Sequence, residues 1–312
     1  MRKPGLSFEL SRGKQFRGWS APLEGIQRSM VFTLLALAPF LVVRPAFSAE
    51  SVGAESAVAS GNPKAEYEIA RAYAEGLGVQ QDYRKAAEYL ERAAGQGYSL
   101  AETELGGFYA KGLGVTRNWS EAAKWYSRGA EHGDPLGQFG IGNLYAKGLG
   151  VSQDAGKAVT WWREAAEQNL AEAQNALGQY YCENANYAEA VRWLTRAAQQ
   201  GCVAAMNNLG YLHEHGLGTS IDFEQAFHWY REAAERGVPK AQSNLALFYE
   251  QGTCVAQDFV EAYKWFKLSA MQGDPIGKRY VRDYDDSHRL TPEQMEKVQR
   301  MLLKFRPKSR RK

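Results

Sequence analysis

Hydrophobic and polar positions recur along most of this chain with a fixed spacing. Glycine, once asparagine, marks the start of each unit, at intervals of 36, 36, 36, 32, 36 and 36 residues: Gly61, Gly97, Gly133, Asn169, Gly201, Gly237 and Gly273. Three more columns keep this step: apolar (Ile69, Leu105, Ile141, Leu177, Leu209, Leu245, Val281), small (Ala86, Ala122, Ala158, Ala190, Ala226, Ala262) and aromatic (Tyr89, Trp125, Trp161, Trp193, Trp229, Trp265). A period between 20 and 50 residues predicts an array of repeated supersecondary units.

Each unit predicts two helices. In the first unit, Asn62 and Pro63 begin a helix with apolar residues at helical spacing, and Gly76 ends it. Asp82 then caps a second helix, and later units keep Asn or Asp there: Asn118, Asp154, Asn186, Asp222 and Asp258. One such pair cannot bury both of its faces, so the units must stack. The aromatic column is therefore predicted to lie in the core.

The unit resembles the Sel-1-like repeat, a relative of the tetratricopeptide repeat. In the third unit the motif consists of Ile141-Gly142, Tyr145, Gly148, Gly150-Val151, Asp154, Lys157-Ala158, Trp161 and Ala165-Ala166. The resemblance implies an all-α fold, a right-handed α-solenoid of stacked helix-turn-helix repeats. It also implies a non-catalytic adaptor that binds other proteins. Some bacterial members of the family are exported and support envelope assembly, exopolysaccharide secretion or host interaction.

The pattern predicts the following domain organisation. Residues 1–49 are a signal peptide or an N-terminal membrane anchor, and residues 50–60 a linker. Six repeats fill residues 61–273, as 61–96, 97–132, 133–168, 169–200, 201–236 and 237–272. The fourth repeat lacks four residues between its helices, which predicts a tighter turn. Residues 274–305 hold a degenerate seventh repeat and a capping helix that begins at the Thr291–Gln294 capping box, and residues 306–312 form a basic tail.

The N-terminal segment predicts export. Six basic residues precede an apolar run over residues 30–43, and small residues follow at 46–49. The run contains Pro39 and is shorter than the ~20 residues that a transmembrane helix needs. We therefore expect a periplasmic or secreted protein, or one anchored to the inner membrane, and the alternative is a cytoplasmic protein with an apolar N-terminus.

Composition and charge narrow the function. With 45% hydrophobic and 23% charged residues the chain can bury a large core. The net charge is +3, but residues 50–312 hold 31 basic and 33 acidic residues, so a nucleic-acid partner is not expected. The basic tail is either a solvated end or a segment that binds anionic lipid or the acidic surface of the array itself.

Candidate chemistry is sparse. The recurrent Gly-Leu-Gly lacks the Lys-Ser/Thr ending of a phosphate loop, and Ser309-x-x-Lys312 lies in the tail, so we predict no catalytic residue and no cofactor. His213 and His215 point to different sides of a helix, which favours no metal site, and His213 is predicted to replace a core tyrosine. The three cysteines, Cys182, Cys202 and Cys254, are predicted to form no intramolecular disulfide.

A peptide-binding groove is the leading hypothesis. If the first helices line an inner face, as the resemblance to tetratricopeptide proteins implies, steps of four residues place eight side chains on it: Phe139, Asn143, Asn175, Gln179, Asn207, Tyr211, Ser243 and Leu247. Asparagine and glutamine can bind an extended peptide backbone, and the apolar residues can anchor side chains. The alternative is a merely solvated repeat face.

Two other functions stay open. Some cysteine-rich relatives are linked to β-lactam binding or hydrolysis, but their paired cysteines are absent here. The second open function is that of an envelope component that assembles polysaccharide, since exposed aromatic residues can stack on sugars.

Overall fold

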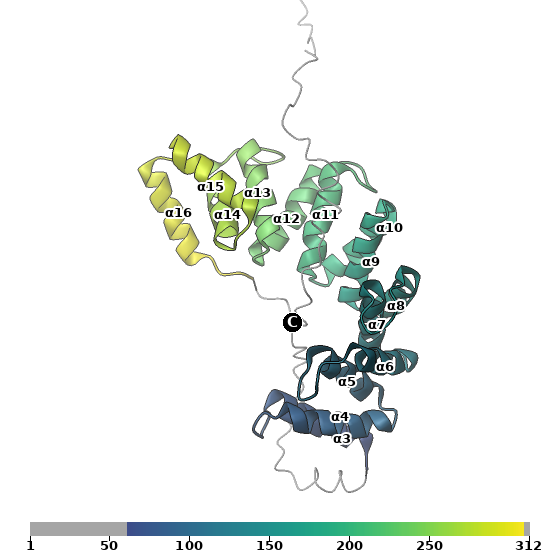
Figure 1. Ribbon diagram of the computed structural model, residues 1–312. Coiled ribbons are helices and arrows are strands. Elements are labelled where there is room, and N and C mark those ends of the chain that lie inside the picture. Colours follow the sequence, from purple (N-terminus) through teal and green to yellow (C-terminus); the bar gives the residue numbers. More distant parts are fainter. Residues whose placement is uncertain (1–60, 309–312) are drawn as a thin grey trace, which may run out of the picture. The chain divides into compact units, whose positions relative to one another are not determined.

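The computed structural model describes residues 61–308. The predicted signal or anchor, the linker to residue 60 and the last four residues lie outside the described residues. The described chain forms fourteen α-helices of 13 residues each (Figure 1). The first helices of the units are α3 (Pro63–Glu75), α5 (Ser99–Lys111), α7 (Pro135–Lys147), α9 (Ala171–Glu183), α11 (Val203–His215) and α13 (Pro239–Gln251). The second helices are α4 (Tyr83–Gly95), α6 (Trp119–Glu131), α8 (Ala155–Glu167), α10 (Tyr187–Gln199), α12 (Phe223–Glu235) and α14 (Phe259–Met271), and α15 (Pro275–Ser287) and α16 (Pro292–Lys304) follow.

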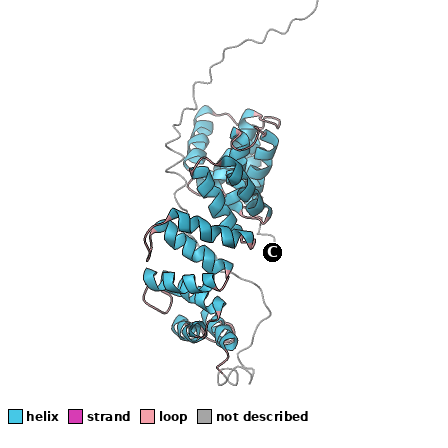
Figure 2. Cartoon of the chain, turned by 90° about the vertical axis from the view of Figure 1, so that its right-hand side faces the viewer, coloured by secondary structure: helices cyan, strands magenta, loops and turns pink. Residues whose placement is uncertain are grey.

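From α3 to α15 each helix packs against the next one in chain order, and the described residues form a right-handed α-solenoid, as the repeat predicts. The helices are joined by short loops, and the described part contains no strand (Figure 2). First helices of successive units also meet, because α5 contacts α7 and α9 contacts α11. None of the described helices is long and apolar enough to cross a membrane.

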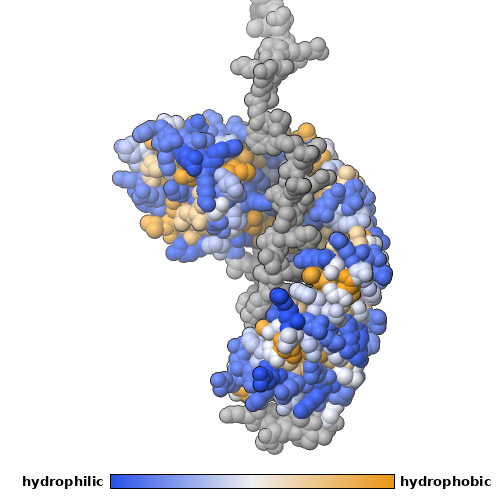
Figure 3. Space-filling model, in the orientation of Figure 1, coloured by the Kyte–Doolittle hydropathy of each residue, from blue (hydrophilic) through white to orange (hydrophobic). Residues whose placement is uncertain are grey.

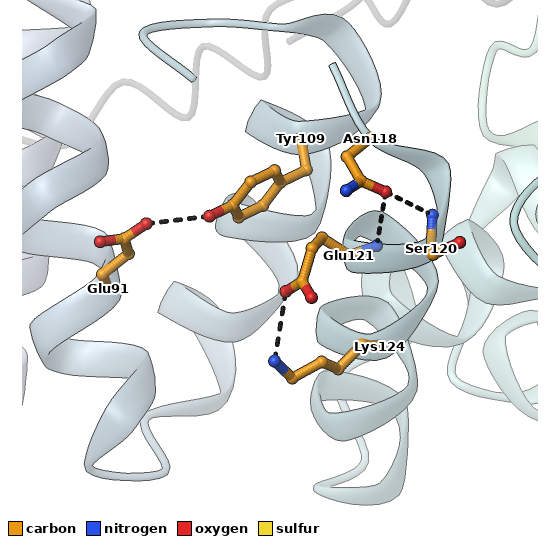
Figure 4. A network of polar contacts seen from close by, with 6 residues as sticks. All are labelled: Glu91, Tyr109, Asn118, Ser120, Glu121 and Lys124. Carbon is orange, nitrogen blue, oxygen red and sulfur yellow. Dashed lines mark hydrogen bonds and ion pairs between the residues drawn. The ribbon is translucent and has the colours of Figure 1, made fainter. Parts of the chain in front are cut away.

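Polar side chains begin most second helices, as predicted. At α6, Asn118 Oδ1 accepts the backbone N–H groups of Ser120 and Glu121 at 3.0 and 3.2 Å, and Lys124 pairs with Glu121 (Figure 4). Equivalent caps form at four further helices through Asp82, Asp154, Asp222 and Asp258. The prediction is wrong for Asn186, whose side chain makes no cap hydrogen bond. Its backbone, in the shortened repeat, has ψ 67°, whereas the other caps are extended.

The glycine-rich loops lie against the preceding repeat. At Gly114, with φ +66°, an added Cβ would lie 2.1 Å from the carbonyl oxygen of Tyr83, the first residue of α4. Gly218 occupies the same position three units further along, after the shortened repeat. In the sixth repeat Cys254 takes this place with φ +53°, and its thiol reaches the carbonyl oxygen of Phe223 at 3.4 Å. Where glycine is present, it allows the loop to approach the preceding repeat closely with a left-handed backbone, and in the sixth repeat Cys254 adopts the same backbone region.

The core confirms the small column, whose six alanines are at most 1% exposed. The aromatic column is only partly buried. Trp193 and Trp265 are buried, but the prediction is wrong for the other four, which are half-buried: Tyr89, Trp125, Trp161 and Trp229. The residue that follows each of them lies in the core: Leu90, Tyr126, Trp162, Leu194, Tyr230 and Phe266. Small residues of the first helices make room for it, since a Cβ on Gly210 would lie 2.7 Å from the ring of Tyr230.

The fourth repeat has the predicted tighter turn. Only residues 184–186 join α9 to α10, whereas residues 148–154 join α7 to α8. Ala185 turns the chain with φ +56°. In the fifth repeat His213 replaces the usual tyrosine and is half-buried.

The C-terminal end forms as predicted. Thr291 and Gln294 make the capping box of α16, which packs against α14. The chain then returns along the array, and the Lys308 ammonium pairs with the Glu235 carboxylate. Among the alternatives named for the basic tail, this contact agrees with an interaction with the acidic surface of the array.

Candidate functional site

The eight predicted groove residues come from four first helices, α7, α9, α11 and α13, two from each helix one turn apart. Six of them are half-buried, as expected for side chains at the edge of a packed face: Asn143, Asn175, Gln179, Asn207, Tyr211 and Leu247. The drawn face of the molecule is mostly hydrophilic, with separate apolar patches and no continuous apolar stripe (Figure 3). Four of the six half-buried groove residues are amides, so a partner there would be recognised largely through polar groups.

Two of the eight residues do not line an open face, and the prediction is wrong for them. Ser243 is fully buried, and its hydroxyl bonds to the Ser269 hydroxyl at 2.8 Å and to Asp274 Oδ2 at 2.7 Å. Phe139 is 8% exposed and belongs to the apolar core around Trp162. The cause is the same for both. In the third and sixth repeats this position is covered by the neighbouring unit, whereas Asn175 and Asn207 at the same position of the fourth and fifth repeats stay half-buried.

Asn143 has a structural partner. Its Oδ1 accepts the indole N–H of Trp162 at 3.1 Å, which leaves its amide N–H groups as donors. Asn175 differs, because its Oδ1 is buried and has no hydrogen-bond partner among the described residues. A buried amide oxygen without a donor costs free energy of folding.

Amide side chains of neighbouring units approach one another. Asn244 Nδ2 lies 3.4 Å from Asn207 Oδ1 and so links α13 to α11. Asn244 was absent from the predicted set, although Asn208 at the equivalent position of the fifth repeat carries the same amide. Tyr211 stacks on His215 with ring centroids 4.1 Å apart, and its partial burial raises the pKa of its phenol. The phenol therefore stays protonated and can donate a hydrogen bond.

A buried polar column runs beside this face, and sequence reasoning missed it. The residue four positions into a first helix bonds to the residue that ends the second helix of the same unit. Gln96 donates to Glu66 at 2.8 Å, Gln168 to Gln138 at 2.8 Å, Gln200 to Gln174 at 2.7 Å and Gln272 to Gln242 at 2.9 Å. In the second unit, the fully buried Glu102 pairs with Arg128 at 3.0 Å and His132 at 2.7 Å. The recurrence of Glu or Gln with the repeat period was the available signal.

In the first two units, Glu104 of α5 interacts with Tyr67 and Arg71 of α3. Burial raises the pKa of Glu104, and hydrogen bonding to Tyr67 and the charge of Arg71 oppose that shift. Arg71 in turn pairs with Glu75 at 2.5 Å. Polar character thus continues along α3 and α5, where the predicted set had no residue.

The arrangement favours binding over covalent chemistry. Burial raises the pKa of Cys182 to about 11 and also raises that of Cys254, so both thiols stay protonated and are weak nucleophiles. Cys182 and Cys254 are free. Within residues 61–308, no three His, Cys, Asp or Glu side chains gather in a group able to hold a metal ion.

Comparisons with known proteins agree on one kind of repeat. The family model described as Sel1 repeat matches residues 63–98, 99–134, 135–170, 171–202, 203–238 and 239–274. The crystal structure of a protective antigen present in uropathogenic Escherichia coli strains, which displays an SLR fold, is 32% identical with a TM-score of 0.77. The match covers 81% of this chain and 55% of that protein, so this chain spans about half of its relative.

A second solved structure, a Sel1 repeat protein from Oxalobacter formigenes, is 31% identical with a TM-score of 0.63. The match covers 69% of this chain and 90% of that one. Among curated proteins, none matches the chain.

Proposed function

Because this chain belongs to the Sel1 repeat family, we propose that it is a non-catalytic scaffold that binds an extended segment of a partner protein along its first helices. The observation that carries this proposal is the amide row over α9, α11 and α13, where Asn175, Asn207 and Asn244 come from three successive repeats. An amide offers both a donor and an acceptor, and therefore pairs with a peptide backbone whatever the peptide sequence.

A further feature supports a peptide over another ligand. Tyr211 and Leu247 stand half-buried on the same two helices as Asn207 and Asn244, where they can anchor apolar side chains of the segment.

The N-terminal sequence supports a place for this scaffold in the bacterial cell envelope. A basic stretch followed by an apolar run and small residues is typical of an export signal. We therefore place the partner in the periplasm, at the inner membrane or outside the cell.

Crosslinking capture from separated envelope and cytosolic fractions tests both parts. We compare the wild type with a triple Asn175→Ala, Asn207→Ala, Tyr211→Ala variant. The expected result is a protein that the wild type captures from the envelope fraction and that the variant loses, because truncated side chains no longer bind the segment.

The matched control replaces three exposed side chains of second helices with alanine: Glu88, Gln199 and Gln225. It should capture as the wild type does, and both variants should keep the wild-type melting temperature within a few degrees. Equal capture by the wild type and the groove variant would refute the groove, and capture from the cytosolic fraction alone would refute the envelope location.

A further inference from the structure

The chain binds an extended segment of its own at the far end of the array. After α16, residues 305–308 leave the helix with extended backbone at Phe305 and turn back along α14 towards the end of α12 (Figure 1). The Phe305 ring packs edge-on against Trp265, with ring centroids 5.6 Å apart. Trp265 is only 5% exposed.

The next contacts of this segment are with Gly237 and with the C-terminal end of α12. Pro307 stands over Gly237, so that a Cβ there would lie 3.5 Å from the proline ring. The Lys308 backbone N–H donates to the Glu235 carbonyl oxygen at 2.8 Å, and its ammonium pairs with the Glu235 carboxylate. Two features stabilise a cation at the end of α12: the Glu235 carboxylate and the negative end of the helix dipole. The surface of the sixth repeat thus holds a segment with the sequence aromatic, any residue, proline, lysine.

The third repeat presents the same three elements. Trp161, Gly133 and Glu131 correspond in the repeat to Trp265, Gly237 and Glu235. The backbone matches, since φ is +85° at Gly133 and +87° at Gly237. The space over Gly133 is open, with no atom within 4 Å of an added Cβ. Trp161 is half-buried, unlike its covered counterpart.

The charge at the two helix ends is also arranged alike. At the end of α12, Arg236 is held by Glu232, and at the end of α6, His132 is held by Glu102. In each case the basic neighbour is engaged by another acid, and the last glutamate of the helix remains for a cation from outside. Glu131 is exposed there.

The other repeats each lack at least one element. The first repeat has Tyr89 in place of the tryptophan, the second has Gly95 in place of the glutamate, and the fifth has Gln199. In the fourth repeat Glu167 is present, but Asn169 replaces the glycine and Trp193 is 3% exposed beneath the guanidinium groups of Arg192 and Arg196. Within residues 61–308, only the third repeat therefore combines a half-buried tryptophan, an open glycine and a glutamate.

We propose that Trp161, Gly133 and Glu131 bind an extended segment of a partner protein with the pattern aromatic, any residue, proline, lysine. The segment lies as residues 305–308 lie on the sixth repeat. The aromatic side chain packs on Trp161, the proline covers Gly133, and the lysine pairs with Glu131. This site uses the second helices and the start of a repeat, so it is separate from the amide row on the first helices. It does not rest on the function proposed above.

A short peptide tests the site. The probe is fluorescein-labelled Lys-Phe-Arg-Pro-Lys amide, the sequence of residues 304–308, and binding is followed by fluorescence anisotropy with the full chain. The wild type should bind it in a saturable manner. Glu131→Lys should weaken binding by about fivefold or more, because one ion pair becomes a repulsion. Glu167→Lys, the same change at the covered fourth repeat, should bind as the wild type does.

Two additional measurements fix the location. A peptide with benzoylphenylalanine in place of phenylalanine should crosslink to α8 of the wild type. A chain that ends at Lys304 exposes the sixth-repeat surface and should bind a second peptide there. Equal binding by the two lysine variants, equal binding of a scrambled peptide, or binding by the shortened chain alone would overturn the proposal. Dimerisation of the wild type that the shortened chain loses would point to a second copy as the occupant, and would overturn the assignment to a partner protein.

Discussion

Replacing Trp162 with alanine should destabilise the array by about 3–5 kcal/mol, the usual cost of truncating a large buried aromatic side chain. Trp162 is 7% exposed and its ring fills the space over Gly142, where a Cβ would lie 2.7 Å away. An aromatic side chain buries roughly 150–250 Å², which at about 25 cal/mol per Å² corresponds to ~4–6 kcal/mol before the retained methyl group is subtracted. The substitution also removes the indole donor to Asn143, worth ~1 kcal/mol.

Thermal unfolding followed by circular dichroism measures the effect. For a chain of this size about 1 kcal/mol shifts the melting temperature by ~2–4 °C, so a fall of roughly 6–20 °C is expected. Each repeat contacts only its neighbours, so the loss should be greatest near the substitution. Hydrogen exchange should therefore become faster in α7, α8 and α9 before it changes in α3 or α14.

Trp161→Ala is the matched control. The two tryptophans are adjacent in α8, but Trp161 is half-buried and has no glycine opposite it in the core. Its loss should cost clearly less than that of Trp162. An equal or larger effect at Trp161 would refute the assignment of the core column to the second position of the pair.

Two further substitutions test other parts of the packing. Burial lowers the pKa of His213, and the charge of Asp222 opposes that shift. Because the unfolded chain therefore takes up the proton at a higher pH than the folded chain, the contribution of His213 to stability falls as the pH drops below ~6.5. His213→Tyr should therefore reduce the loss of stability in urea unfolding between pH 7 and pH 5, and parallel pH profiles would contradict this. Gly218→Ala should cost about 1–3 kcal/mol, because φ is +71° and the Cβ would lie 2.3 Å from the Tyr187 carbonyl carbon. Gly201→Ala, with φ +86° but open space around the Cβ, isolates the backbone strain, and equal costs in thermal unfolding would rule out the close approach.

The helices and their ends could be predicted because local chemistry determines them. Asn118 caps α6 through its own next residues, and the glycine at position 112 ends α5 with φ +73°. Both signals lie within a few positions of the helix end and recur in five of the six repeats, so the sequence contains several independent instances of each.

The identity of the core aromatic residue could not be predicted in the same way. Trp161 and Trp162 are adjacent, both are aromatic, and a shift of one residue rotates a side chain by about 100° around the helix. The deciding feature is Gly142, which lies on another helix. The same limit applies to the candidate site, because the burial of Ser243 depends on Asp274, thirty-one positions later in the chain.

The buried polar column explains why the fifth repeat differs from the others. Elsewhere, a buried Glu or Gln is satisfied by the residue that ends the second helix of its unit, and such a pair fixes how the two helices sit against each other. In the fifth repeat the buried position is Met206, which offers Arg236 no acceptor. Arg236 instead pairs with Glu232, and its Nε is buried without a partner among the described residues. Glu232 thereby holds the arginine in the role that buried Glu102 has for His132 in the second repeat, and in both repeats the last glutamate of the helix is left unpaired by its basic neighbour.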